Sequence, residues 1–303
     1  MADQHGRRAR AVLSLSTGSS TDQAWTPSAQ QLDRLAYRRG RATRSALIGL
    51  ASTLTVVVVV VAGLVNTPGW PRVKSSFFDL AVARAALPEV LVGLWLNIRV
   101  MAVCAVFILA FGLGIALLRT LKGPVFFPLR ALATAYVDLL RGLPLLLVLL
   151  VVGFGVPGLR LQGLPSSVVF YGGVALVLTY SSYVAEVFRA GIESVHPSQQ
   201  AAARGLGLSY RQTMRHVVVP QAVRRVVPPL LNDLVSLQKD SGLISILGVI
   251  DAVRAAQISQ AEYASFTPYM VAGVLFVLLT IPLTRLTDRI ARKQGWQGAG
   301  GVP

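Results

Sequence analysis

Long apolar stretches alternate along the chain with polar segments rich in arginine. A run of about 20 apolar residues is long enough to cross the roughly 30 Å hydrocarbon core of a bilayer. Because lipid offers no hydrogen-bonding partners, each isolated span is expected to be helical. The pattern predicts an all-α integral membrane protein with six transmembrane helices, at about residues 46–65, 90–118, 143–156, 168–188, 226–250 and 268–286.

Some of these stretches carry further expectations. Arg99 interrupts the second stretch, so the span itself is expected nearer Val100–Leu118. The third, Leu143–Val156, is short for a complete crossing. Residues 119–142 carry four basic side chains and are expected to form a loop, as are residues 251–267 on the other side of the membrane.

The distribution of basic residues indicates the orientation. With the N-terminus inside, the segments between spans that face inward hold 22 of the 29 Lys and Arg residues, and those that face outward hold 5. Basic residues accumulate in cytoplasmic loops. We therefore expect a multi-pass protein of the cytoplasmic membrane with both termini in the cytoplasm, residues 1–45 and 291–303 forming polar tails.

Composition narrows the class further. Charged residues make up 14% of the chain, against about 25% in soluble domains. The net charge of +16 would suit a nucleic-acid partner. The basic residues are concentrated in the segments that face inward, however, and this orientation explains the net charge without a nucleic acid. Cys104 is the sole cysteine, and His5, His196 and His216 lack metal-ligand spacing. No metal site and no cofactor are therefore expected.

The segment 189–225 predicts a pair of short helices between two spans. Pro197 suits the first turn of a helix. Gly207 can adopt the left-handed conformation that closes it. Ser209 then caps a second helix, with Gln212 completing a capping box, and Pro220 is expected to limit that helix.

The same segment resembles a motif of the permease subunits of binding-protein-dependent ABC importers. That motif reads Glu-Ala-Ala, three residues, Gly, nine residues, Ile, any residue, Leu-Pro, and this chain matches every spacing from residue 201 to 220. Ala201 stands for Glu, Val217 for Ile and Val219 for Leu. The resemblance implies ATPase-coupling residues at Ala201, Ala202, Ala203, Arg204, Gly207, Val217 and Pro220.

The resemblance extends over residues 88–290 and is strongest to polar amino-acid permeases of the glutamate and glutamine type. Similar stretches are Ala135–Pro144, Ser182–Ile192 and Pro220–Lys239. It implies a five-helix core, to which the helix at 46–65 is an addition. It also implies a role as permease of an ATP-driven importer of a polar amino acid. The implied partners are two ABC ATPase subunits, an extracytoplasmic amino-acid-binding protein and a second permease chain.

Polar side chains within predicted spans are candidates for the translocation pathway, because ionisable groups in a membrane are costly. Lys239 lies seven residues after Asn232, so the two share a helix face. They either line a path for a zwitterion or have structural roles. Glu186, three residues before Arg189, either forms a local ion pair or joins the loop to the bundle. The pathway candidates are Asn232, Asp233, Lys239, Asp240 and Glu186.

Other classes explain part of the pattern. Gln199, Ala203 and Gly207 have the spacing of a helix-turn-helix, which would suit a membrane-anchored DNA-binding regulator, but such a reader needs a core of its own. A secondary transporter or channel would need its own coupling-ion site, often within paired repeats, and no internal repeat is visible. The chain lacks a G-x-x-x-x-G-K-[ST] phosphate loop, so we expect no enzyme here and ATP hydrolysis by a separate subunit.

Overall fold

The computed structural model describes residues 28–121 and 123–293, and within these ranges every regular element is a helix. The predicted all-α class is therefore confirmed. Four helices are long and apolar enough to cross a membrane, and there are up to six spans if each of two bent helix pairs counts as one. The chain divides into two compact units, residues 1–70 and 71–303.

The first unit is dominated by one helix, α2 (Ala29–Val65), of which Thr43–Val65 has the length and hydropathy of a membrane span. The expected tail 1–45 is therefore helical from Ala29, while residues 1–27 lie outside the described residues. The residues before the apolar run include Ala, Gln, Leu and Arg, which favour helix, so the polar segment continues the helix of the span.

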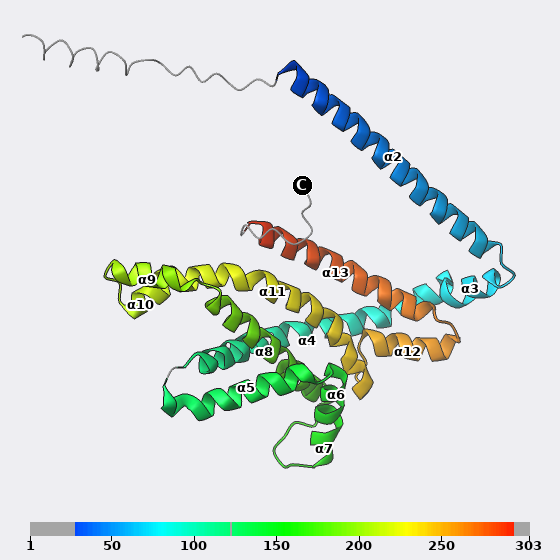
Figure 1. The fold of residues 1–303 in the computed structure, drawn as a ribbon. Helices are drawn as coiled ribbons and strands as arrows, with labels where there is room; N and C mark the ends of the chain where they lie inside the picture. Colours follow the sequence, from blue (N-terminus) through cyan, green and yellow to red (C-terminus); the bar gives the residue numbers. More distant parts are fainter. Residues whose placement is uncertain (1–27, 122, 294–303) are drawn as a thin grey trace, which may run out of the picture. The chain divides into compact units, whose positions relative to one another are not determined.

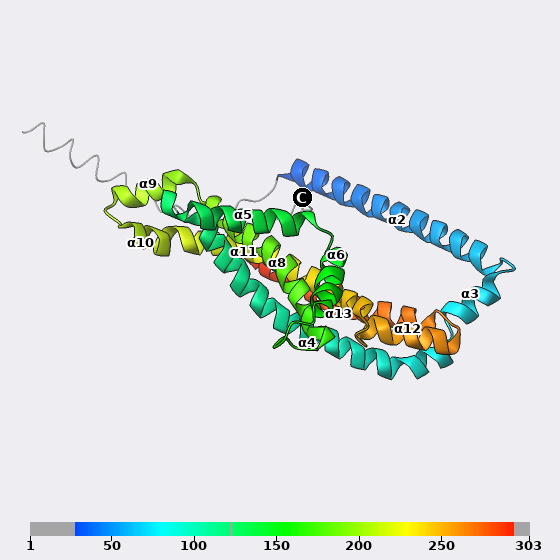
Figure 2. The same ribbon diagram turned by 90° about the horizontal axis from the view of Figure 1, so that it is seen from below.

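Long helices form the frame of the second unit: α4 (Leu80–Thr120), α8 (Val168–Glu193), α11 (Val219–Asp240) and α13 (Thr267–Lys293), preceded by the short α3 (Trp70–Phe77). Helix α8 packs against both α4 and α11, and the three run side by side in Figures 1 and 2. The expected start of the second span near Val100 is not a helix boundary, because α4 is continuous through Pro88 and Arg99.

The core lies between α4, α8 and α11. Leu176, Leu237 and Ile244 are buried there. Close helix contact depends on Gly112, where an added Cβ would lie 2.5 Å from Cγ1 of Val184. Small residues at such crossings let membrane helices approach closely.

The expected loop at 119–142 is wrong. Most of it forms α5 (Phe127–Gly142). The segments Pro124–Gly142 and Leu145–Gly158 make up one of the two bent pairs, with an angle of 106° between them. That second arm consists of α6 (Leu145–Leu150), a π turn and α7 (Val156–Gly158). Charged residues are scattered along α5, so the sequence analysis did not recognise it as an amphipathic helix.

The expected outer loop at 251–267 is also wrong in part, because it contains α12 (Ala252–Tyr263). A 3₁₀ segment, η4 (Ser241–Leu247), connects α11 to the start of α12, and the pair bends by 52°. Asp251 is fully buried at this bend. The side-chain amide of Asn97 donates to the Asp251 carboxylate and to the Ser241 carbonyl, each at 3.0 Å.

Gly93 gives a direct test of this packing. A Cβ at Gly93 would lie 2.4 Å from the backbone nitrogen of Ala252 and 2.4 Å from the carbonyl carbon of Asp251. Because both atoms belong to the backbone, Gly93→Ala is expected to reduce stability by about 1–2 kcal/mol. Gly114→Ala, on the same helix with open space around it, is the control. Equal melting temperatures of the two variants in detergent would contradict this packing.

Candidate functional site

The helix pair in segment 189–225 forms an elbow, defined here as α9 (Pro197–Gly205), the turn Leu206–Ser209 and α10 (Tyr210–Thr213). Figures 1 and 2 place it at the end of the second unit opposite to α12. His196 caps α9, with its ring nitrogen accepting from the Ser198 backbone N–H at 3.2 Å, and Pro197 lies in the first turn as predicted.

Gly207 makes the turn of the elbow. Its φ of +85° is left-handed, as predicted. Its N–H donates to the Arg204 carbonyl at 2.9 Å, and the Leu208 N–H donates to the Ala203 carbonyl at 3.2 Å. These two bonds form a Schellman motif, which satisfies the last carbonyls of α9. The predicted capping box between Ser209 and Gln212 starts α10.

The expectation that Pro220 ends the second helix is wrong. A π turn, η3 (Met214–Val218), follows α10 directly, and α11 begins at Val219. Pro220 therefore lies in the first turn of α11, where its fixed φ suits a helix. The second arm of the elbow is thus continuous with α11.

The surface of the elbow combines small, apolar and basic groups. Ala201 and Ala202 are exposed, whereas Ala203 is buried. Leu206 is 85% exposed at the tip. The guanidinium of Arg204, also exposed, lies 5.7 Å from the centre of the Tyr210 ring. Apolar and arginine side chains are thus exposed together on the elbow.

Two further motif residues lie beyond the elbow, at its base. Val217 is half-buried and Pro220 is exposed. Their neighbour Val218 packs in a small cluster with Val195 and Ala222. The base of the elbow is therefore attached to the end of α8 as well as to α11.

Two of the candidate carboxylates lie on the side of α11 that faces α8. The Tyr180 hydroxyl donates to a carboxylate oxygen of Asp240 at 2.6 Å. Asp233 and Tyr180 together line a pocket of about 260 Å³ between α4, α8 and α11. One Asp233 oxygen is buried and has no hydrogen-bond partner among the described residues. The pocket therefore offers an acceptor to a cationic or hydrogen-bond-donating group.

The other two candidates of α11 point elsewhere. Asn232 and Lys239 are both exposed and share one face, as predicted from their spacing. The α-helix ends at Asp240 and continues as 3₁₀ from Ser241. Exposed polar groups at membrane depth need water or a protein partner, so this face of α11 is suited to an aqueous path or a subunit contact.

Glu186 lies apart from these residues. Its carboxylate pairs with Arg189 on the same helix, as the local interpretation predicted. It also accepts from Arg119 of α4 at 2.8 Å and lies 4.0 Å from Arg141 of α5. We call Glu186, Arg119, Arg141 and Arg189 the Glu186 cluster. It connects three helices at the end of the unit that carries the elbow.

Sequence reasoning missed several partners. Tyr180 and Arg119 are separated from their acidic partners by 60 and 67 residues, so no local spacing indicates the contacts. The Asn97–Asp251 contact spans 154 residues. A polar Asn inside the apolar stretch 90–118 was the available signal. In the described part of the chain, no group of His, Cys, Asp or Glu could hold a metal ion.

Comparisons with known proteins agree with the geometry. A family model for binding-protein-dependent transport system inner membrane components matches residues 112–295. The chain is 39% identical over 178 residues to the probable glutamine ABC transporter permease protein GlnM of Bacillus subtilis (strain 168), covering 58% of this chain and 80% of the relative. It is 34% identical to the glutamate transport system permease protein GluC of Corynebacterium glutamicum, covering 68% and 96%.

Solved structures give the same fold. A crystal structure of an amino acid ABC transporter with histidines superposes with a TM-score of 0.65 at 30% identity, covering 71% of this chain and 98% of that one. An inward-facing conformation of the MetNI methionine ABC transporter gives a TM-score of 0.55 at 21% identity, covering 68% and 95%.

Proposed function

The chain belongs to the family of binding-protein-dependent transport system inner membrane components, and from this premise we propose an ATP-driven role in the import of glutamate or a related polar amino acid. It is a multi-pass permease of an amino-acid ABC importer in the cytoplasmic membrane. The observation that carries the proposal is the continuous helical path from the elbow into α11.

The elbows of the two permease chains are the proposed contacts with two ABC ATPase subunits. Ala201 and Ala202 leave room for close approach, and Leu206 and Arg204 supply apolar and charged contacts. ATP binding moves the ATPases, and the elbow transmits that movement to α11. Coupling requires that the ATPases bind the elbow differently in the two states of the permease.

The polar groups of α11 are the proposed route for the amino acid. Asp233 and Asp240 supply negative charge near Tyr180, and Lys239 supplies positive charge on the adjoining face. A zwitterion has an ammonium and a carboxylate group, so it requires both signs along its path. A second permease chain completes the path beside the exposed face of α11, and an extracytoplasmic binding protein delivers the substrate.

Reconstitution tests the proposal as a whole. The permease, its ATPase and its binding protein are placed in proteoliposomes, and uptake of radiolabelled glutamate is measured with glutamine and arginine as competitors. Uptake is expected only with internal ATP and external binding protein. Uptake driven by a Na⁺ or H⁺ gradient without ATP would indicate a secondary transporter instead.

Lys239→Leu is expected to reduce uptake about tenfold, because the exposed face of α11 then lacks its cation. The ATPase should still co-purify with the variant, since Lys239 lies outside the elbow. Unchanged uptake kinetics would assign Lys239 a structural role.

Asp233→Asn is expected to raise the KM for transport about tenfold with little change in membrane level. The buried, unpartnered oxygen becomes part of a neutral amide, so the attraction to an ammonium group is lost while the shape is kept. Asp79→Asn, at the cap of α4, controls for loss of one carboxylate elsewhere. An unaltered KM for Asp233→Asn would remove this residue from the route.

A further inference from the structure

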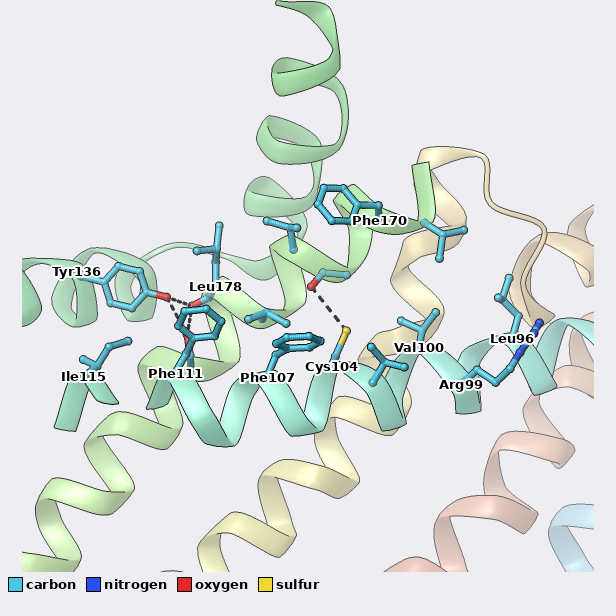
Figure 3. A pocket seen from close by; sticks show the side chains of 16 residues that line it. Leu96, Arg99, Val100, Cys104, Phe107, Phe111, Ile115, Tyr136, Phe170 and Leu178 are labelled. Carbon is cyan, nitrogen blue, oxygen red and sulfur yellow. Dashed lines mark hydrogen bonds between the residues drawn. The ribbon is translucent and has the colours of Figure 1, made fainter. Parts of the chain in front are cut away.

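A second, larger hollow runs along α4 and is separate from the Asp233 pocket. This groove has a volume of about 780 Å³ and is lined by α4, α8 and Tyr136 of α5. Figure 3 shows Arg99 at one end and Tyr136 at the other, with Val100 and Phe107 between them. Val103 and Phe111 continue the same face of α4 at helical spacing.

The polar groups within the groove are already paired. The Tyr136 hydroxyl lies 2.7 Å from the Leu178 carbonyl oxygen and 2.8 Å from the Ser181 hydroxyl. The Cys104 thiol donates to the Gly173 carbonyl at 3.7 Å. Between Arg99 and Tyr136 a polar amino acid would therefore meet no free partner, whereas an aliphatic chain would bury its surface against Val and Phe side chains.

Arg99 differs from the other lining residues. Its side chain is exposed at the end of the groove, and no ion pair of Arg99 occurs among residues 28–121 and 123–293. Arg119, on the same helix, is by contrast paired with Glu186. An unpaired cation beside a hydrocarbon-lined groove is complementary to a molecule with an anionic head and an apolar tail.

The length of the groove suits a membrane lipid. Arg99 and Ile115 are sixteen positions apart on α4, which corresponds to about 24 Å of helix. The hydrocarbon depth of one leaflet is roughly 15 Å, so the groove is long enough to hold an acyl chain that crosses one leaflet. We propose that the groove binds an anionic phospholipid, with one acyl chain along α4 and the phosphate at Arg99. This inference needs only the membrane location, so its test is independent of transport.

Photo-cross-linking measures the proposed binding. The protein is placed in bilayers of equal phosphatidylglycerol and phosphatidylcholine, each in turn carrying a diazirine on the acyl chain, and adducts are mapped by mass spectrometry. Adducts on groove peptides are expected to favour phosphatidylglycerol about fivefold, as one Arg near an anionic lipid surface would give. Arg99→Gln should remove this preference, while Arg84→Gln, on α4 outside the groove, should keep it.

Filling the groove provides a second arm. A Cβ at Gly173 makes an ordinary 3.5 Å contact with the Cys104 sulfur, so Gly173→Leu is expected to project into the groove and reduce adducts of both lipids about fivefold or more. Gly114→Leu, with open space around it, should leave them unchanged. Equal adducts from the two lipids, a preference that survives Arg99→Gln, or cross-links from the groove to a second protein chain would each overturn the proposal.

Discussion

Replacing Gly207 with valine is expected to remove most amino-acid uptake while the protein still inserts into the membrane. The φ of +85° at this position is unfavourable for any residue with a Cβ and worst for a β-branched one. The strain is conformational alone, because a Cβ at Gly207 would meet no atom within 4 Å. A strain of about 2 kcal/mol would lower the equilibrium constant for forming the native elbow about thirtyfold.

The readouts are ATP-dependent uptake, ATPase activity and the amount of permease in the membrane. Uptake should fall by up to about thirtyfold at an unchanged membrane level, leaving ATP hydrolysis uncoupled from transport. Gly205→Val is the matched control, since Gly205 is also exposed and free of neighbours within 4 Å but has helical backbone. Wild-type uptake by Gly207→Val would argue against the coupling role of the elbow.

The elbow could be predicted from the sequence because its signals are local. Pro197, Gly207 and the Ser209–Gln212 box each act within one helical turn. Their effect does not depend on what packs nearby. Pro220 was misinterpreted because a proline is compatible both with the end of one helix and with the first turn of the next. The π turn before it has no recognisable sequence signal.

Helices α5 and α12 were missed for a different reason. Both lie in segments whose charges and polar residues favoured loops between spans. Their buried faces are small: Ala133 and Val137 in α5, and chiefly alanines in α12. Alanine burial gives little hydropathy contrast, so these helices depend on tertiary packing that a periodic pattern does not reveal.

The polar contacts of the site were only partly predictable. The spacing in the sequence predicted that Asn232 and Lys239 share one helix face and that Glu186 pairs with Arg189. The spacing could not predict the contacts of Asp240 with Tyr180 and of Glu186 with Arg119, because those contacts depend on how α8 packs against α11 and α4. Candidate residues could thus be named from the chain, whereas their partners required the fold.

Glu186→Gln is expected to destabilise the permease by about 2–3 kcal/mol, because it leaves the arginines of the Glu186 cluster without their shared counter-charge. Arg119 and Glu186 have side chains only 12% and 21% exposed, so solvent screens the loss weakly. The measurement is thermal unfolding in detergent. Uptake should fall as well, since the cluster holds α4, α5 and α8 together at the end that carries the elbow.

Glu193→Gln separates this effect from the loss of any acidic group on α8. Glu193 also pairs with Arg189, but its side chain is 58% exposed, so its removal should cost less than about 1 kcal/mol. Combining Arg119→Gln with Glu186→Gln should destabilise by less than the sum of the two single changes, because the second no longer leaves Arg119 unpaired. Additive effects, or equal losses for Glu186→Gln and Glu193→Gln, would show that the bond between α4 and α8 does not hold the bundle together.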